Sequence, residues 1–116
     1  MVESVHLVKG AIDALLDRNC QDAAVYKVGS FVGYTDYIVV ATGRSSRQIK
    51  SLADEVESRV RSLGGKIIGV EGREAGDWVL VDCGGVVIHL FQESSRDYYK
   101  IDELWSSYKV APEALK

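Results

Sequence analysis

The sequence predicts a single α/β domain of the α+β type, built on a mixed sheet of about five strands with helices packed against it. Two observations support this fold class. Stretches rich in β-branched and aromatic residues alternate with segments whose apolar residues recur at helical spacing. The chain of 116 residues also has the length of one domain and contains only one proline. We expect one domain over residues 1–116, with an ordered core from about 2 to 108.

Two amphipathic helices are expected in the first part of the chain. Residues 2–18 place their apolar side chains on one stripe, and residues 46–63 carry an almost unbroken i, i+3, i+4, i+7 apolar series. Ser45 or Ser46 can cap the second helix by accepting a hydrogen bond from a free backbone amide. Gly64-Gly65 follows that helix as the expected left-handed stop. The helix over 46–63 is the best-defined element of the sequence.

The other elements follow from local composition and turn signals. Strands are expected over residues 23–28, 34–42 and 66–70 and in both halves of 77–91. Residues 92–97 have the composition of a linker, and residues 98–108 that of a short helix. We expect residues 110–116 to be frayed. The predicted order is helix, strand, strand, helix, three strands and a final helix.

Residues 77–91 form the predicted centre of the sheet. Gly84 and Gly85 provide the permissive backbone that a tight turn needs, so the two halves should form a hairpin. Alternation places every second residue of the first strand on the same face. One face therefore carries Trp78, Leu80 and Asp82, and the other carries Val79 and Val81. Because neither face is purely polar, both need a cover, from helices or from a partner.

Composition excludes several classes of protein. A formal net charge of −3 argues against a protein that holds nucleic acid by neutralising phosphates, so any link to nucleic acid should run through protein contacts. No apolar run approaches the roughly 20 residues of a membrane span, and the first residues lack signal features. We expect a cytosolic protein with no membrane association. Cys20 and Cys83 are expected to be free thiols.

No motif supports catalysis or a cofactor. The stretch 43–46, Gly-Arg-Ser-Ser, follows a predicted strand and resembles a phosphate-binding turn, or the Gly-Ser turn of nucleotidyltransferases. The latter needs an Asp-x-Asp pair for its metals, and Asp77 and Asp82 are five apart, on opposite faces of a strand. Ser46, His89 and Asp82 are not expected to form a catalytic triad, because no Gly-x-Ser-x-Gly elbow is present, and we expect His89 to satisfy a hydrogen bond within or beside the sheet. No metal-ligand spacing is present. We expect no enzyme, no metal and no cofactor.

Several motifs occur together and in order. They are Thr35-Asp36, Ala41 to Gln48, Val70-Glu71-Gly72, Asp77 to Asp82, Val87-Ile88-His89, and Glu93 through Arg96 to Tyr99 and Leu104-Trp105. With these motifs the chain resembles the ribosomal silencing factor family, also called the Iojap-like family, from about Val5 to Trp105. Gln48 stands where many members of that family have histidine.

This resemblance implies a function. A family member docks on the fourteenth protein of the large ribosomal subunit, at the face where the subunits join, and sterically blocks the small subunit. Translation is thereby repressed when nutrients are short. The family fold is similar to that of nucleotidyltransferases but lacks their catalytic acids, and free members are often homodimers.

The resemblance also implies a partner-binding surface at Trp78, Asp82 and Tyr99, and with them Glu71 and Arg73 in the preceding loop. The strand pattern adds Leu80, which shares a face with Trp78, and aromatic residues of this kind are enriched at binding hot spots. Two alternatives stay open. One is a diverged nucleotidyltransferase-like protein that still binds nucleotides, and the other is a structural dimer whose aromatics only close its own interface.

Overall fold

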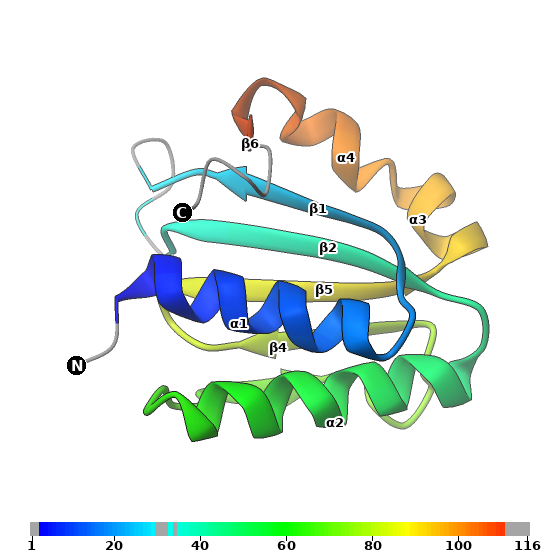
Figure 1. The fold of residues 1–116 in the computed structure, drawn as a ribbon. Helices are drawn as coiled ribbons and strands as arrows, with labels where there is room; N and C mark the ends of the chain where they lie inside the picture. The colour runs from blue at the N-terminus through cyan, green and yellow to red at the C-terminus, as the bar shows by residue number, and fades with distance from the viewer. Residues whose placement is uncertain (1–2, 30–32, 34, 111–116) are drawn as a thin grey trace.

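The computed structural model describes residues 3–29, 33 and 35–110, and at residues 97–99 and 101 the backbone alone. Its helices and strands are mixed along the chain, with two strands between the first and second helices and three between the second and third (Figure 1). In order they are α1 (Ser4–Asp17), β1 (Gln21–Lys27), β2 (Tyr37–Gly43), α2 (Ser46–Ser62), β3 (Gly69–Glu71), β4 (Trp78–Asp82), β5 (Val86–Gln92), α3 (Glu93–Tyr99), α4 (Ile101–Leu104), the 3-10 helix η1 (Ser106–Tyr108) and β6 (Lys109–Val110).

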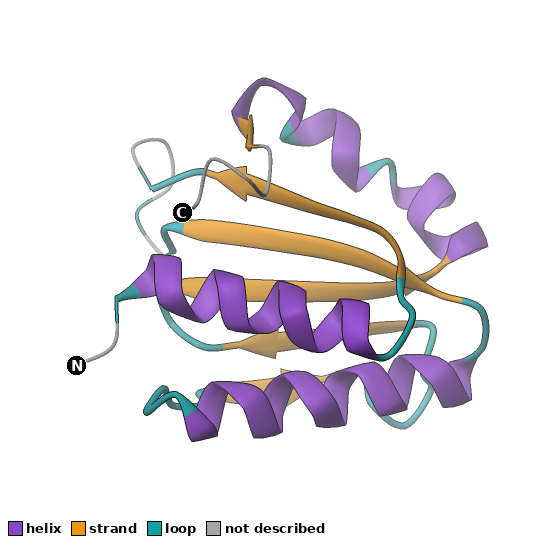
Figure 2. Ribbon diagram, viewed as in Figure 1, coloured by secondary structure: helices purple, strands orange, loops and turns teal. Residues whose placement is uncertain are grey.

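The strands form one mixed sheet in the order β3-β4-β5-β2-β1-β6. Strands β2 and β5 at its centre are parallel, and the other neighbouring pairs are antiparallel. Helices α1 and α2 lie side by side over one face of the sheet (Figure 2), where their apolar stripes and the strands bury the larger core. The predicted fold class, an α+β domain with a mixed sheet, is confirmed.

The opposite face of the sheet has only a partial cover. A smaller core there joins residues of β1 and β2 to Phe91 of β5 and Trp105. Trp105 and Tyr108 come from the C-terminal segment, which runs over the β1 side of the sheet (Figure 1). This arrangement leaves β3 and β4 less covered on this face than β1 and β2.

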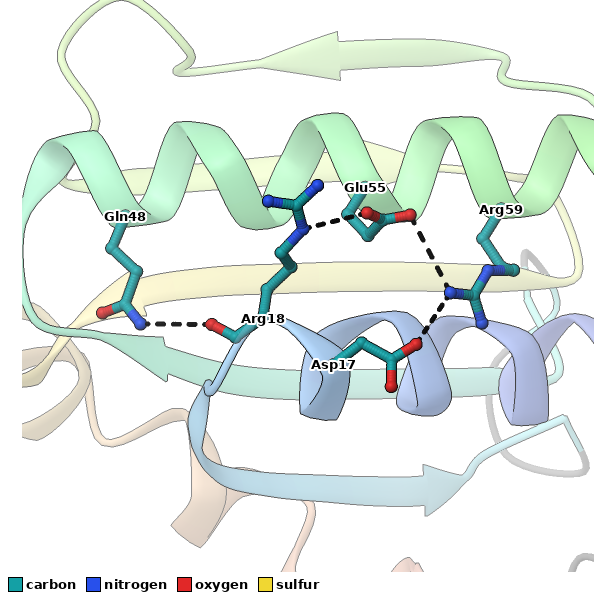
Figure 3. A network of polar contacts seen from close by, with 5 residues as sticks. All are labelled: Asp17, Arg18, Gln48, Glu55 and Arg59. Carbon is teal, nitrogen blue, oxygen red and sulfur yellow. Dashed lines mark hydrogen bonds and ion pairs between the residues drawn. The ribbon is translucent and has the colours of Figure 1, made fainter.

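Helix α2 forms as its sequence predicts. Ser45 is the N-cap, and its hydroxyl accepts a hydrogen bond from the Gln48 backbone amide at 3.1 Å. The Gln48 side chain then binds the Arg44 amide and the carbonyls of Arg18 and Asn19, which ties the start of α2 to the end of α1 (Figure 3). The apolar stripe of α2 is buried against the sheet.

The hairpin of β4 and β5 also forms as predicted. The Cys83 amide donates to the Val86 carbonyl at 2.9 Å, and Gly84 takes the positive φ of 79° that the turn requires. Val79 and Val81 are buried under α1 and α2, whereas alternate residues on β4 stay partly exposed on the other face. Cys20 and Cys83 are free thiols, as expected.

The strand count was wrong by one, and some strand limits differ. The sheet has six strands because Lys109 and Val110, where fraying was expected to begin, pair with Tyr26 and Val25 as β6. Two residues carry too little pattern to predict a strand. Strand β3 is shorter than predicted and begins at Gly69, and β2 begins at Tyr37. Residues 111–116 lie outside the described part.

The expected linker at 92–97 was wrong, and the helix expected at 98–108 is confirmed only as separate short helical pieces. Residues Glu93–Tyr99 form α3, which lacks an apolar stripe and therefore gave no signal at helical spacing. Lys100 adopts a left-handed conformation with φ 51°, so the helical path is interrupted there and resumes as the short α4 and η1. Among the described residues, no helix is long and apolar enough to cross a membrane.

Candidate functional site

Four of the six predicted binding residues lie together on one face of β3 and β4. Glu71 pairs with Leu80 in the antiparallel register, and Trp78 and Asp82 lie two residues before and two residues after Leu80 on the same face. We call Glu71, Trp78, Leu80 and Asp82 the β3–β4 strip. Glu71 is exposed and the other three are half-buried. The strip faces away from α1 and α2, on the side of the sheet with the partial cover.

Trp78 is held in one orientation by two neighbours on β5. Its ring stacks on Phe91 with centroids 4.9 Å apart, and its indole Nε1 donates a hydrogen bond to Nδ1 of His89 at 3.0 Å. An aromatic side chain fixed in this way gives up little conformational freedom when it binds a partner. The contact supports Trp78 as a binding anchor and also gives it a part in the packing of the sheet.

His89 is suited to this contact because it stays neutral. Its side chain is 8% exposed, and burial lowers the pKa of its imidazole to about 4. Accepting the indole proton requires a lone pair on Nδ1, so the histidine proton is carried by Nε2. The sequence alone suggested a hydrogen-bonded His89 without its partner. The hairpin register, which pairs Leu80 with His89 and Trp78 with Phe91, was the signal that could have identified it.

Asp82 has a structural task in addition to its place on the strip. Its Oδ1 accepts a hydrogen bond from the Gly84 amide at 2.9 Å. A carboxylate that bonds the backbone two residues on stabilises a turn, here the one between β4 and β5. Any substitution of Asp82 therefore affects the hairpin as well as the surface.

Arg73 does not lie with the strip. Its guanidinium is bound to Asp54 and, at 2.9 Å, to Glu57, both on α2 on the other side of the sheet. These two carboxylates neutralise its charge and fix the loop between β3 and β4 to α2. The sixth predicted residue, Tyr99, is the last residue of α3, and its side chain lies outside the described part.

A second cluster of polar residues lies between the sheet and the C-terminal helices. Arg96 donates to both carboxylate oxygens of Asp102 at 2.7 and 2.8 Å, to the Thr42 hydroxyl at 2.8 Å and to the Asp22 carbonyl at 2.6 Å. Tyr26 donates to Asp102 at 2.5 Å. The hydrogen bond from Arg96 lowers the pKa of Asp102, and burial together with the bond to Asp102 raises that of Tyr26. Sequence reasoning missed this cluster.

This cluster lines a polar cavity, but its hydrogen bonds hold parts of the protein together. The guanidinium of Arg96 donates its hydrogen bonds to atoms of the protein itself and is therefore not free to bind a nucleotide phosphate. Over the described ranges, no three His, Cys, Asp or Glu side chains are grouped so that they could hold a metal ion. The cluster links α3 and α4 to β1 and β2.

Known proteins that resemble the chain agree with one another. Residues 2–115 match the family model described as ribosomal silencing factor during starvation. The ribosomal silencing factor of Chromobacterium violaceum is 40% identical over 108 residues, which cover 93% of this chain and 88% of that protein. A mouse protein named mitochondrial assembly of ribosomal large subunit protein 1 is 31% identical over 98 residues, covering 82% of this chain and 43% of that protein.

Solved structures show the same relationship. A crystal structure of a Chromobacterium violaceum protein, 40% identical, superimposes with a TM-score of 0.88 and covers 90% of this chain and 88% of its own. A Bacillus halodurans structure, 28% identical, superimposes with a TM-score of 0.81 and covers 91% of this chain and 97% of the other chain. The agreement of the family model, the relatives and the fold confirms the resemblance that the motifs indicated: this chain belongs to the ribosomal silencing factor family.

Proposed function

We propose that this protein binds the large ribosomal subunit through the β3–β4 strip, on the fourteenth protein of that subunit, and thereby prevents the small subunit from joining. Membership of the silencing factor family supports a role on the ribosome. The mouse relative's name, which refers to assembly of the large subunit, agrees with the choice of subunit. Translation is repressed because the subunits stay apart, and no chemical step is required.

The observation that carries this proposal is the composition and fixed geometry of the strip. Trp78 supplies an aromatic anchor that is already oriented by His89 and Phe91, and Leu80 adds an aliphatic neighbour. Aromatic anchors flanked by apolar contacts are typical of the few residues that provide most of the binding free energy. Glu71 and Asp82 place two carboxylates beside them, which suits the basic surface of a protein that binds RNA.

The size of the protein supports a steric mechanism. The molecule measures 32 by 31 by 24 Å. Subunit surfaces that associate must approach to within van der Waals contact over their interface. A body at least 24 Å across that docks where the two subunit surfaces touch would hold those surfaces apart and so exclude the small subunit. We propose that the free protein is cytoplasmic and homodimeric, and that it uses no cofactor.

A subunit-joining experiment tests this function. Purified small and large subunits are separated at low Mg²⁺, incubated with the protein, returned to high Mg²⁺ and resolved on a sucrose gradient. We expect free subunits to accumulate and the protein to sediment with the large subunit, with all ribosomal RNA intact. Protein added after joining is the control, and it should act more slowly because its site is then covered. Normal joining at saturating protein would contradict the proposal.

A further inference from the structure

The arginines of this protein divide into two groups by their partners. Five form ion pairs with carboxylates: Arg18, Arg59, Arg61, Arg73 and Arg96. The other two, Arg44 and Arg47, have no carboxylate within ion-pair distance among the residues described, and the same is true of Lys50. Arg47 and Lys50 lie in the first turns of α2, and Arg44 comes just before its N-cap, Ser45. We call Arg44, Arg47 and Lys50 the basic patch.

The position of the basic patch is electrostatically unfavourable for the folded protein alone. The N-terminus of a helix carries a partial positive charge, so carboxylates stabilise it and cations do not. The first turn of α2 has no acidic residue. With the Gln21 amide oriented for hydrogen bonding, its oxygen accepts from Arg44 at 2.9 and 3.2 Å, and this neutral partner leaves the charge of Arg44 uncompensated. Among the described residues, no carboxylate therefore compensates the positive charge at this helix end.

The patch also borders a hollow that is rigidly framed. Arg47, Lys50 and Arg18 line a cavity of about 480 Å³ along the outer side of α2. The carboxylates at its other end, Asp54 and Glu55, are already paired with Arg73 and Arg18 and do not neutralise Arg47 or Lys50. Gln48 fixes the frame by linking α2 to the end of α1 (Figure 3).

The basic patch and the Trp78 end of the β3–β4 strip lie toward the same end of the molecule, on opposite faces of the sheet, and the loop before β4 connects them. A Cβ atom built on Gly76 would lie 2.6 Å from the Cβ of Ser46, so the loop that leads into Trp78 touches the first residue of α2. Figure 1 shows this end, where β2 passes into α2 beside the loop that precedes β4. A large partner that contacts Trp78 and extends around this end of the sheet, past the Gly76 loop, can reach the patch.

We propose that the basic patch binds backbone phosphates of the large-subunit RNA next to the protein that the strip contacts. This inference rests on the proposed function and extends it. Guanidinium groups match the geometry of phosphate oxygens, and helix-terminal amides favour the same anion. The net charge of −3 argues against RNA binding over a wide surface, so the contact we propose is a local one, in which three cations meet phosphates while the strip presents carboxylates to protein. The contact is independent of RNA sequence.

The test compares two triple variants that change the net charge equally. Arg44→Gln, Arg47→Gln and Lys50→Gln neutralise the patch, and Lys9→Gln, Lys27→Gln and Lys66→Gln are the control. Binding to large subunits is measured against KCl concentration at fixed Mg²⁺. Each phosphate contact contributes about 0.7 to 0.9 to the slope of log K against log salt, so the patch variant should lose about 2 to 3. The Tm of the patch variant should stay the same or rise, because the substitutions remove positive charges from the positive end of a helix dipole.

Several results would contradict the inference. If the patch variant kept the salt slope of the wild type, these residues would not contact RNA phosphates. If the control variant lost as much of the slope as the patch variant, the loss would be a general effect of net charge. A Trp78→Ala protein tests the strip separately, because it should bind more weakly with an unchanged slope. A photo-crosslinking residue in place of Arg47 should give an RNase-sensitive product on large subunits. A product that resists RNase would assign the patch to a protein partner.

Discussion

His89 makes the stability of the fold depend on pH in a range where few other groups interfere. In the folded protein its pKa is about 4, and in the unfolded chain it takes the ordinary value of 6.5. Between these values the unfolded state binds more protons, so the free energy of unfolding must rise with pH and fall on acidification. Linkage gives a loss of about 2 kcal/mol between pH 7.5 and pH 5, approaching about 3 kcal/mol below pH 4.

Urea unfolding at pH 7.5, 6.5, 5.5 and 5 measures this loss, and His89→Gln is the control because glutamine can accept the Trp78 hydrogen bond without titrating. Asp102, whose pKa is lowered, contributes stability that disappears only below its ordinary value of 3.8, outside this range. We expect the variant to lose about 2 kcal/mol less than the wild type over the series. Equal pH dependence of both proteins would refute the neutral, buried His89 on which the orientation of Trp78 depends.

Two further predictions concern the framework. Arg96→Met should cost about 2–3 kcal/mol of stability, since it leaves the partly buried Asp102 without its ion pair, whereas Arg61→Met, which removes an exposed pair, should cost under about 0.5 kcal/mol. Urea unfolding of both variants measures these losses of stability. Equal losses would contradict the role of Arg96 in holding α3 and α4 to the sheet. Ser45→Ala should cost about 1 kcal/mol through loss of the helix cap, with little effect from Ser46→Ala. If thermal melting showed that Ser46→Ala lowers the stability more than Ser45→Ala, the assignment of Ser45 as the helix cap would be contradicted.

Elements governed by local periodicity could be predicted from the sequence. The apolar series of α2 and its Ser45 cap are short-range features, and so is the alternation that separates Trp78, Leu80 and Asp82 from Val79 and Val81. These patterns are enough to place three of the proposed binding residues on one face. They do not show what covers that face.

The features that escaped prediction depend on contacts between distant residues. Helix α3 is positioned by Arg96, whose partners Asp22 and Thr42 lie 74 and 54 positions away in the sequence. The resemblance implied that Arg73 belongs to the partner surface, but its ion pairs with α2 appear only when the chain is folded. Local sequence patterns carry no information about such pairings.

The central claim is that the β3–β4 strip is the surface that docks on the large subunit, and a matched pair of variants on one strand tests it most directly. Trp78→Ala removes the anchor on the strip. Val81→Ala removes methyl groups from a fully buried side chain on the opposite face of β4. Both should lower the stability by about 2–3 kcal/mol, Trp78→Ala because its ring is half-buried on Phe91.

Binding to purified large subunits, measured by co-sedimentation at a temperature where both variants are folded, separates the two. We predict that Val81→Ala binds like the wild type and that Trp78→Ala binds about thirtyfold more weakly, the equivalent of about 2 kcal/mol. Wild-type binding by folded Trp78→Ala, or an equal loss in both variants, would contradict docking through the β3–β4 strip.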